Sequence, residues 1–278
     1  MTAMNKRIFL LFLALLLALG STEGGCGTIN TNVTSYATIL SDGQIDIKYE
    51  IGNTGDDTAH RVMVTTFLAL DAQKSDDLGS NPPGGLIRYN CRLSSSDLKP
   101  GKYTLVARIS FDEQSGTSHR VYHFSPLPYR LDRVKEVSPA LSVELSEPYF
   151  SVKSFWQAGG KCRLSLKNNL GVAILPVVTL YLPDGFTTKE PERSYQLAPG
   201  EKREEVIPLE MDASVKNTRP FYAVAWYEQN GIHSSQWIEG KIRVEERPVY
   251  FKGFLVIAGT VLVVFLAVFF YRKRSDRK

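Results

Sequence analysis

Hydrophobic and polar residues alternate along most of the middle of the chain, in short runs rich in Val, Ile, Thr, Tyr and Phe. Alternation buries one face of a β-strand and leaves the other in water, as in an antiparallel sandwich. Between residues 21 and 250 no stretch repeats its apolar positions every 3.6 residues, so this region is predicted to be all-β. The predicted strands cover residues 44–51, 61–68, 103–111, 120–124, 162–167, 177–182, 202–209, 221–227 and 236–244.

The two halves of this region match each other. Asn53-Thr54-Gly55 follows one predicted strand, and Asn169-Leu170-Gly171 follows another 116 residues later. Tyr103-x-x-Val106-Ala107 and Phe221-x-x-Val224-Ala225 match at a spacing of 118. A repeat of this length is typical of one immunoglobulin-sized sandwich. We therefore predict two tandem immunoglobulin-like β-sandwiches, at residues 21–136 and 137–248, that meet near Ser138-Pro139.

The N-terminal end carries an export pattern. Lys6-Arg7 precedes twelve apolar residues, and Ala18-Leu19-Gly20 fits a cleavage site, which predicts a secretory signal peptide at residues 1–20. An uncleaved membrane anchor is the alternative, although a span needs about 20 residues. A lipid on Cys26 is a second alternative, but Glu23 stands where a lipobox needs an aliphatic residue.

The C-terminal end carries a membrane pattern. Residues 253–271 form an uncharged run of 19 residues, followed by the basic tail 272–278. Such a run spans a bilayer as a helix, and positive charge stays in the cytoplasm. A buried core helix is the alternative, but it would usually have a polar face. We expect a single-pass protein of the cell membrane, with the N-terminal part outside and the tail in the cytoplasm.

The charge of +4 is concentrated at the ends of the chain. They hold eight of the 33 basic residues and one of the 29 acidic residues, which leaves the middle region with a net charge of −3. A broad basic face is therefore not expected, and neither is a nucleic-acid partner.

Two Leu-x-Pro-Gly elements accompany the predicted strands: Leu98-Lys99-Pro100-Gly101 abuts a penultimate strand, and Leu197-Ala198-Pro199-Gly200 precedes an earlier one. With the Asn-x-Gly turns and the aromatic-rich penultimate strands, they resemble bacterial and archaeal immunoglobulin-like domains. The cell-adhesion-related domain found in bacteria and the NEW domain associated with alpha-galactosidases are the most similar. The resemblance covers most of residues 28–246, and it implies a binding or spacer module without catalytic residues.

Three cysteines face an oxidising compartment in this topology. Cys26 and Cys91 fall in the same predicted sandwich and can form a disulfide, although both can equally be unpaired. Cys162 begins a predicted strand and is expected to be a small buried hydrophobe. Asn32-Val33-Thr34 is an N-glycosylation acceptor if the organism glycosylates.

The sequence contains no pattern of catalytic residues. Nucleophile-elbow, zinc-protease and phosphate-loop motifs are absent, so no enzyme activity, cofactor or metal is expected. His119 and His123 share a strand face, are too far apart to chelate one ion, and are expected to be solvated. Asp71, Asp76 and Asp77 lie in a predicted long loop that is either solvated or able to hold calcium.

Aromatic side chains are the candidate binding residues, because Tyr and Trp dominate the energetics of interfaces. The candidates are Trp156, Trp226 and Trp237, each of which can instead belong to a core. Residues 222, 224 and 226 share one strand face and residues 223, 225 and 227 the other, and parity does not tell which face is inside. We interpret the chain as a non-enzymatic membrane protein whose exported domains bind or hold a protein or glycan at the cell surface. The alternative is an accessory or scaffold subunit of an envelope secretion, transport or glycan-processing complex.

Overall fold

The middle of the chain forms β-sheets almost throughout. The computed structural model describes residues 27–40, 42–68, 72–94, 98–131, 140–151, 160–212, 215, 217–245, 253–254 and 256–261. Strands dominate these residues, which confirms the all-β prediction, and residues 253–254 and 256–261 are helical. Within the described part of the chain, no helix has the length and apolarity needed to cross a bilayer. The predicted signal peptide and most of the predicted span at 253–271, with the tail 272–278, lie outside the described residues.

The first sandwich places a three-stranded antiparallel sheet against a four-stranded one. Alternate residues of both sheets point inward and form one hydrophobic core that includes Ile47, Tyr49, Leu105 and Ile109. The smaller sheet has the order β1 (Thr31–Ile39), β2 (Gln44–Asn53), β5 (Leu86–Ser94), and the larger one has the order β4 (Ala72–Asp77), β3 (His60–Leu68), β6 (Gly101–Asp112), β7 (Ser118–Tyr129).

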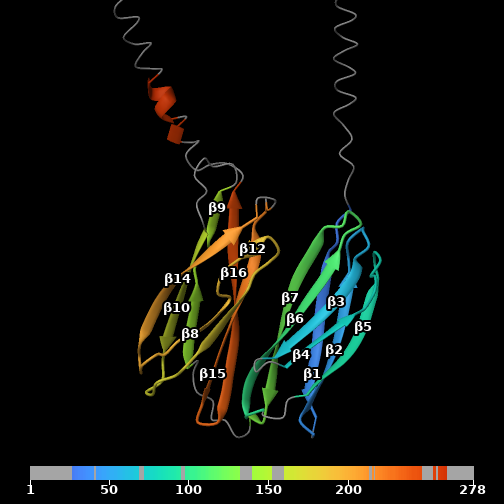
Figure 1. The fold of residues 1–278 in the computed structure, drawn as a ribbon, viewed down its shortest axis with the longest axis vertical. Coiled ribbons are helices and arrows are strands. Elements are labelled where there is room, and N and C mark those ends of the chain that lie inside the picture. Colours follow the sequence, from blue (N-terminus) through green and yellow to red (C-terminus); the bar gives the residue numbers. More distant parts are fainter. Residues whose placement is uncertain are drawn as a thin grey trace, which may run out of the picture.

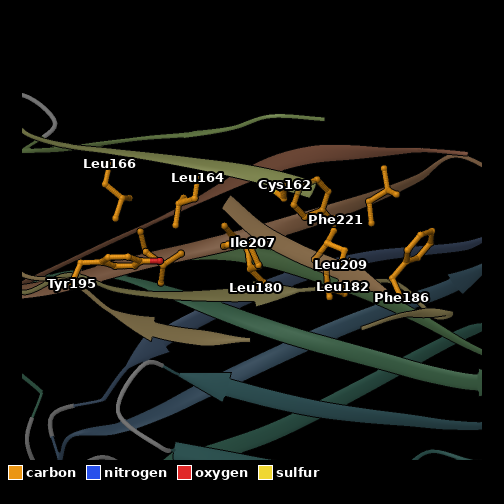
Figure 2. Packing of buried hydrophobic residues seen from close by; sticks show 14 of the residues in the cluster. Cys162, Leu164, Leu166, Leu180, Leu182, Phe186, Tyr195, Ile207, Leu209 and Phe221 are labelled. Carbon is orange, nitrogen blue, oxygen red and sulfur yellow. The ribbon is translucent and has the colours of Figure 1, made fainter. Parts of the chain in front are cut away.

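The second sandwich has its own core, which is drawn in Figure 2. Leu164, Leu166 and Ile207 of one sheet point into the space between the sheets, toward Leu180 of the other sheet. One sheet has the order β12 (Phe186–Thr187), β14 (Lys202–Met211), β10 (Gly160–Asn168), β8 (Leu141–Leu145). The other has the order β13 (Glu192–Ser194), β11 (Val177–Tyr181), β15 (Arg219–Gln229), β16 (Ile232–Glu245), and β9 (Tyr149–Ser151) pairs with β16.

The two sandwiches repeat one strand order. The sheet β1-β2-β5 corresponds to β8-β10-β14, and the sheet β4-β3-β6-β7 corresponds to β13-β11-β15-β16. The predicted boundary near Ser138-Pro139 lies outside the described residues.

One segment differs from its prediction. Residues 72–77, expected in a long loop, form strand β4 at the edge of the larger sheet. Its sequence is polar on both faces, as edge strands often are, so it shows no alternation of hydrophobic and polar residues. Asp76 accepts a hydrogen bond from the Tyr89 hydroxyl, and Asp77 Oδ1 accepts one from the Gly79 amide at 2.9 Å. These two carboxylates are therefore used within the protein, and Asp71 lies outside the described residues.

The sandwiches lie side by side and head to tail (Figure 1). Strand β16 runs parallel to β6 and antiparallel to β15, so β15 runs opposite to β6, its counterpart in the first sandwich. The short parallel pairing of His233 with Gly101 joins the two larger sheets. Strand β1 begins and β16 ends at the same end of the molecule, at the top of Figure 1.

Candidate functional site

The outer faces of the two larger sheets cover each other. Ala223, Ala225 and Tyr227 of β15 point into the core of the second sandwich, whereas Tyr222, Val224 and Trp226 point outward. Val224 is only 4% exposed and Val106 of β6 only 2%, although neither belongs to a hydrophobic core. The face with Ala223, Ala225 and Tyr227 is therefore the inner one, which strand parity alone could not tell. The outward face of β15 is an interface with the first sandwich.

Five aromatic side chains form the middle of this interface, and we call them the seam cluster. Phe124 of β7 lies at its centre, with ring centroids 4.6 Å from Tyr222, 5.6 Å from Tyr181 and 6.3 Å from Trp237. Tyr122 of β7 meets Tyr181 edge to face at 5.3 Å. Burial raises the pKa of Tyr181 to about 12, so its phenol stays neutral. Trp237 remains 39% exposed, which leaves part of the cluster open to solvent.

Polar contacts flank the cluster on both sides. Arg120 Nε lies 3.5 Å from Asp184 Oδ1 across the interface, and this pair is partly exposed. Ser235 Oγ donates to Thr104 Oγ1 at 2.8 Å. Exposed ion pairs contribute little to stability, so the apolar contacts supply most of the docking energy.

The two sandwiches meet backbone to backbone at Gly101 and His233, and we call this place the joint. The His233 amide donates to the Pro100 carbonyl at 2.9 Å. A Cβ at Gly101 would stand 1.9 Å from the His233 carbonyl oxygen, and the φ of +149° also favours glycine. The Leu-x-Pro-Gly element at residues 98–101 therefore lets the two backbones meet.

The His233 imidazole is enclosed at the joint. Its ring stacks on those of Tyr103 and Trp226, with ring centroids 3.9 Å and 5.7 Å apart. The His233 side chain has no exposed surface. Burial lowers the pKa of His233 to about 4, against a smaller opposing influence of Glu228. Glu228 also forms an ion pair with Lys99, which links the two sandwiches beside the imidazole. The ring is therefore neutral near pH 7.

The predicted aromatic binding residues lie mainly in this interface. Trp226 contacts His233, and Trp237 contacts Phe124, so both have partners within the protein. Of these two, Trp237 is the more exposed, at 39%. Trp156 lies outside the described residues.

The remaining predicted sites are spread over both sandwiches. Asn32 is exposed on β1, so an attached glycan would meet solvent, and the glycosylation stays a prediction. Cys91 is buried, with Sγ 3.8 Å from Thr66 Oγ1, and burial raises its pKa. Its predicted partner Cys26 lies outside the described residues, so the disulfide stays a prediction as well. Cys162 is fully buried in the second core, as expected.

His119 and His123 share the inward face of β7, and the prediction of a solvated face is wrong. His119 Nε2 lies 2.7 Å from Glu113 Oε1, and its ring stacks on Phe111 at 5.4 Å. His123 Nε2 lies 2.9 Å from Ser35 Oγ, and burial lowers its pKa. Both rings are half-buried because β1 lies beside β7.

A serine and histidine as close as Ser35 and His123 can act as nucleophile and base, but no described carboxylate bonds to the His123 ring to orient it. The described residues hold no group of three candidate metal ligands.

Sequence reasoning missed His233 and the seam cluster as a unit. The signal for His233 was its position directly opposite Glu228 across the Asn230-Gly231 hairpin turn. Nothing in the sequence showed that Tyr103 of the other sandwich covers the ring, because that contact joins residues 130 positions apart.

No protein-family model and no curated protein matches this chain. Solved structures similar to it include red sea bream transglutaminase, at 12% identity, 79% of this chain, 31% of that chain and a TM-score of 0.25. They also include Escherichia coli alpha-2-macroglobulin activated by porcine elastase, at 10% identity, 78% of this chain, 22% of that chain and a TM-score of 0.33. The chain spans less than a third of either structure, and TM-scores this low carry no argument about function.

Proposed function

We propose that this chain is a non-enzymatic, single-pass membrane protein whose two immunoglobulin-like sandwiches bind or hold a protein or glycan partner outside the cytoplasm. The observation that carries the proposal is that β1 begins and β16 ends at the same end of the molecule (Figure 1). The predicted signal peptide precedes β1, and the predicted span follows β16. A tether at that end leaves the opposite end, with the joint and the β15–β16 hairpin, free to reach a partner.

Two further features support the proposal. Seven repeated strands in two facing antiparallel sheets favour the immunoglobulin-like assignment of each sandwich. The interface that covers Val106 and Val224 favours one stiff unit over two domains on a flexible linker. A stiff unit holds its contact surface at a set distance from the membrane, and confinement to the membrane raises the effective concentration of a modest binding site.

The topology is tested with a tag placed after Lys278 and protease added to spheroplasts. We expect residues 27–245 to be digested and the tag to be spared until the membrane is permeabilised. Loss of the tag from intact spheroplasts would overturn the proposed orientation.

The need for the tether is tested by comparing the full chain with a chain that ends at Arg247, each expressed in a strain lacking the protein. We expect the shortened chain to be secreted and folded and to restore function less well. Full restoration by the secreted form would contradict a tethered role.

A further inference from the structure

The joint holds a buried histidine whose polar atoms are not satisfied. Neither ring nitrogen of His233 has a hydrogen-bond partner among the described residues. Glu228 Oε1 is 3.7 Å from Nδ1, which is too long for a hydrogen bond. Burial without a hydrogen-bond partner is costly for a neutral polar group and much more costly for a charged one. The enclosure of His233 therefore favours the uncharged imidazole.

The charged and titratable groups around His233 come from both sandwiches. Lys99 lies just before β6, and Glu228 lies on β15; these two pair with each other. Tyr103 of β6 covers one face of the ring. Lys102 of β6 stands opposite Ser234 and is exposed, and Tyr129 of β7 stands opposite Gly101 with Arg130 above its ring. A proton on His233 would place a new positive charge beside Lys99, while Glu228 is already paired.

We propose that His233 makes the docking of the two sandwiches sensitive to pH, so that acidification loosens the joint while each sandwich stays folded. The ring contacts the first sandwich through Tyr103 and its own sandwich through Trp226, so separation of the two would expose it to water. Water would stabilise the imidazolium that the closed joint excludes. Protonation is thereby coupled to opening rather than to unfolding of either core.

The direction of the effect follows from proton linkage. The pKa of His233 is lowered to about 4 in the docked state, and the ordinary value of 6.5 applies once the ring is solvated. The docked state binds fewer protons, so its stability is fully present above about pH 6.5 and declines as the pH falls toward 4. These two values imply that the docking equilibrium weakens roughly tenfold between pH 7.5 and 5.5.

Opening of the joint would change which side chains are exposed to solvent. The outward faces of β6, β7, β11, β15 and β16 carry the seam cluster together with Val106 and Val224, and undocking would expose them. An acidic environment would thus change which aromatic side chains a partner can reach. This pH dependence belongs to the intramolecular joint and holds whatever partner the molecule binds.

The test is hydrogen–deuterium exchange of the full-length chain in a nanodisc, with rates corrected for the intrinsic effect of pH. The probes are the amides of residues 101–104 and 233–235, which lie on the two sides of the joint. We expect their protection to fall roughly tenfold from pH 7.5 to 5.5. Amides in the centres of β2 and β10 should keep their protection over this range.

Three variants separate His233 from other causes. His233→Phe keeps a flat ring between Tyr103 and Trp226 but cannot take a proton, so protection at the joint should no longer depend on pH. Lys99→Gln removes the neighbouring positive charge and frees Glu228 for the imidazolium, so the acid-induced loss should become smaller. His60→Phe changes a histidine far from the joint and should behave as the unaltered chain.

The inference is overturned if His233→Phe and Lys99→Gln both lose protection in acid as the unaltered chain does. It is also overturned if protection of the unaltered chain stays constant, or rises because His233 pairs with Glu228. Because Lys99 is partly exposed and Lys99→Gln is a mild change, the test remains decisive even if His233→Phe fails to fold.

Discussion

The two sandwiches share a buried asparagine at the end of the corresponding strands β2 and β10, and they differ in the loop that follows it. Asn53 is 1% exposed; its Oδ1 accepts from the Gly55 amide, and its Nδ2 donates to the carbonyls of Asp57 and Asn81. Asn168 is fully buried; its Oδ1 accepts from the Leu170 amide, and its Nδ2 donates to three carbonyls.

The loops themselves have opposite character. The loop at residues 54–58 is polar and is held by Thr28, whose amide and hydroxyl donate to Asp56. In the loop at residues 169–176, Val172 is 48% exposed and Leu175 is 66% exposed. In both sandwiches a single buried amide side chain therefore sets the turn, while the rest of the loop can vary. Substitution of these two asparagines is therefore the most sensitive test of the structural equivalence of the two sandwiches.

Removal of either buried asparagine should have the largest effect on stability. Asn168→Ala removes four hydrogen bonds of a fully buried side chain. The Leu197 and Ala198 carbonyls keep a backbone amide donor, whereas the Val172 carbonyl and the Leu170 amide lose this partner, and we expect the free energy of unfolding to fall by about 3 kcal/mol. Asn53→Ala should cost a similar or slightly smaller amount, since it loses two carbonyl partners. Chemical denaturation measures both.

Asn169→Ala is the matched control. Asn169 is the residue that the sequence aligned with Asn53, but its side chain donates to Ser142 in an exposed position. We expect a loss below about 1 kcal/mol. A larger loss from Asn169→Ala than from Asn168→Ala would contradict the structural equivalence of Asn53 and Asn168.

The glycines of the two Leu-x-Pro-Gly elements, Gly101 and Gly200, have different surroundings. Gly101→Ala would place a methyl group against the His233 backbone, so we expect the joint to open at a cost of about 2 to 3 kcal/mol. Gly200 has a φ of +71°, but a Cβ there would meet no neighbouring atom within 4 Å, so Gly200→Ala should cost only about 1 kcal/mol of backbone strain. Exchange protection at residues 233–235 should fall only for Gly101→Ala, and equal effects of the two changes would rule out a close contact at the joint.

The seam cluster tests whether the two sandwiches unfold together. Phe124→Ala removes the ring at the centre of the cluster and should weaken docking by about 2 kcal/mol. Thermal unfolding followed by calorimetry should then broaden or split into two transitions. Tyr36→Ala, at a tyrosine of the same sandwich that is 69% exposed, should change stability by less than about 0.5 kcal/mol. A single sharp transition in the Phe124→Ala protein would show that the cluster does not couple the two cores.

The smallest expected effect concerns the reactivity of the two buried cysteines, which should differ between the native and the denatured chain. Burial raises the pKa of Cys91, and it raises that of Cys162 to about 11, so little thiolate is present in either core at pH 8. Both should resist alkylation in the native chain, as counted by mass spectrometry. In denaturant without reductant Cys162 should react at once, and Cys91 should react only if it is not bonded to Cys26.

Much of the fold could be predicted from the sequence. Strands β2, β3, β6, β10 and β15 were visible because one face of each is buried in a core, and burial of one face requires alternation. Strand β4 was missed because an edge strand with two polar faces lacks that pattern. The repeat was visible too, but its register was one residue off, because Asn168 and Asn169 are adjacent and only burial tells them apart.

The candidate site was much less predictable. Trp226 and Trp237 stood out as aromatic residues, yet Tyr103 and Phe124, which complete their surroundings, belong to the other sandwich. His119 and His123 were correctly placed on one strand face, but that face turned out to be half-buried beside β1. Strand parity divides residues into two faces without telling which face another domain covers.

The all-β class and most strands of this protein follow from its sequence, because they depend on neighbours a few residues apart. Three features come from tertiary packing alone: the sandwiches lie head to tail, Gly101 meets the His233 backbone, and His233 loses its contact with water. These features arise from packing between residues more than a hundred positions apart. Their energies depend on burial and on the absence of a hydrogen-bond partner, which no local pattern of residues encodes.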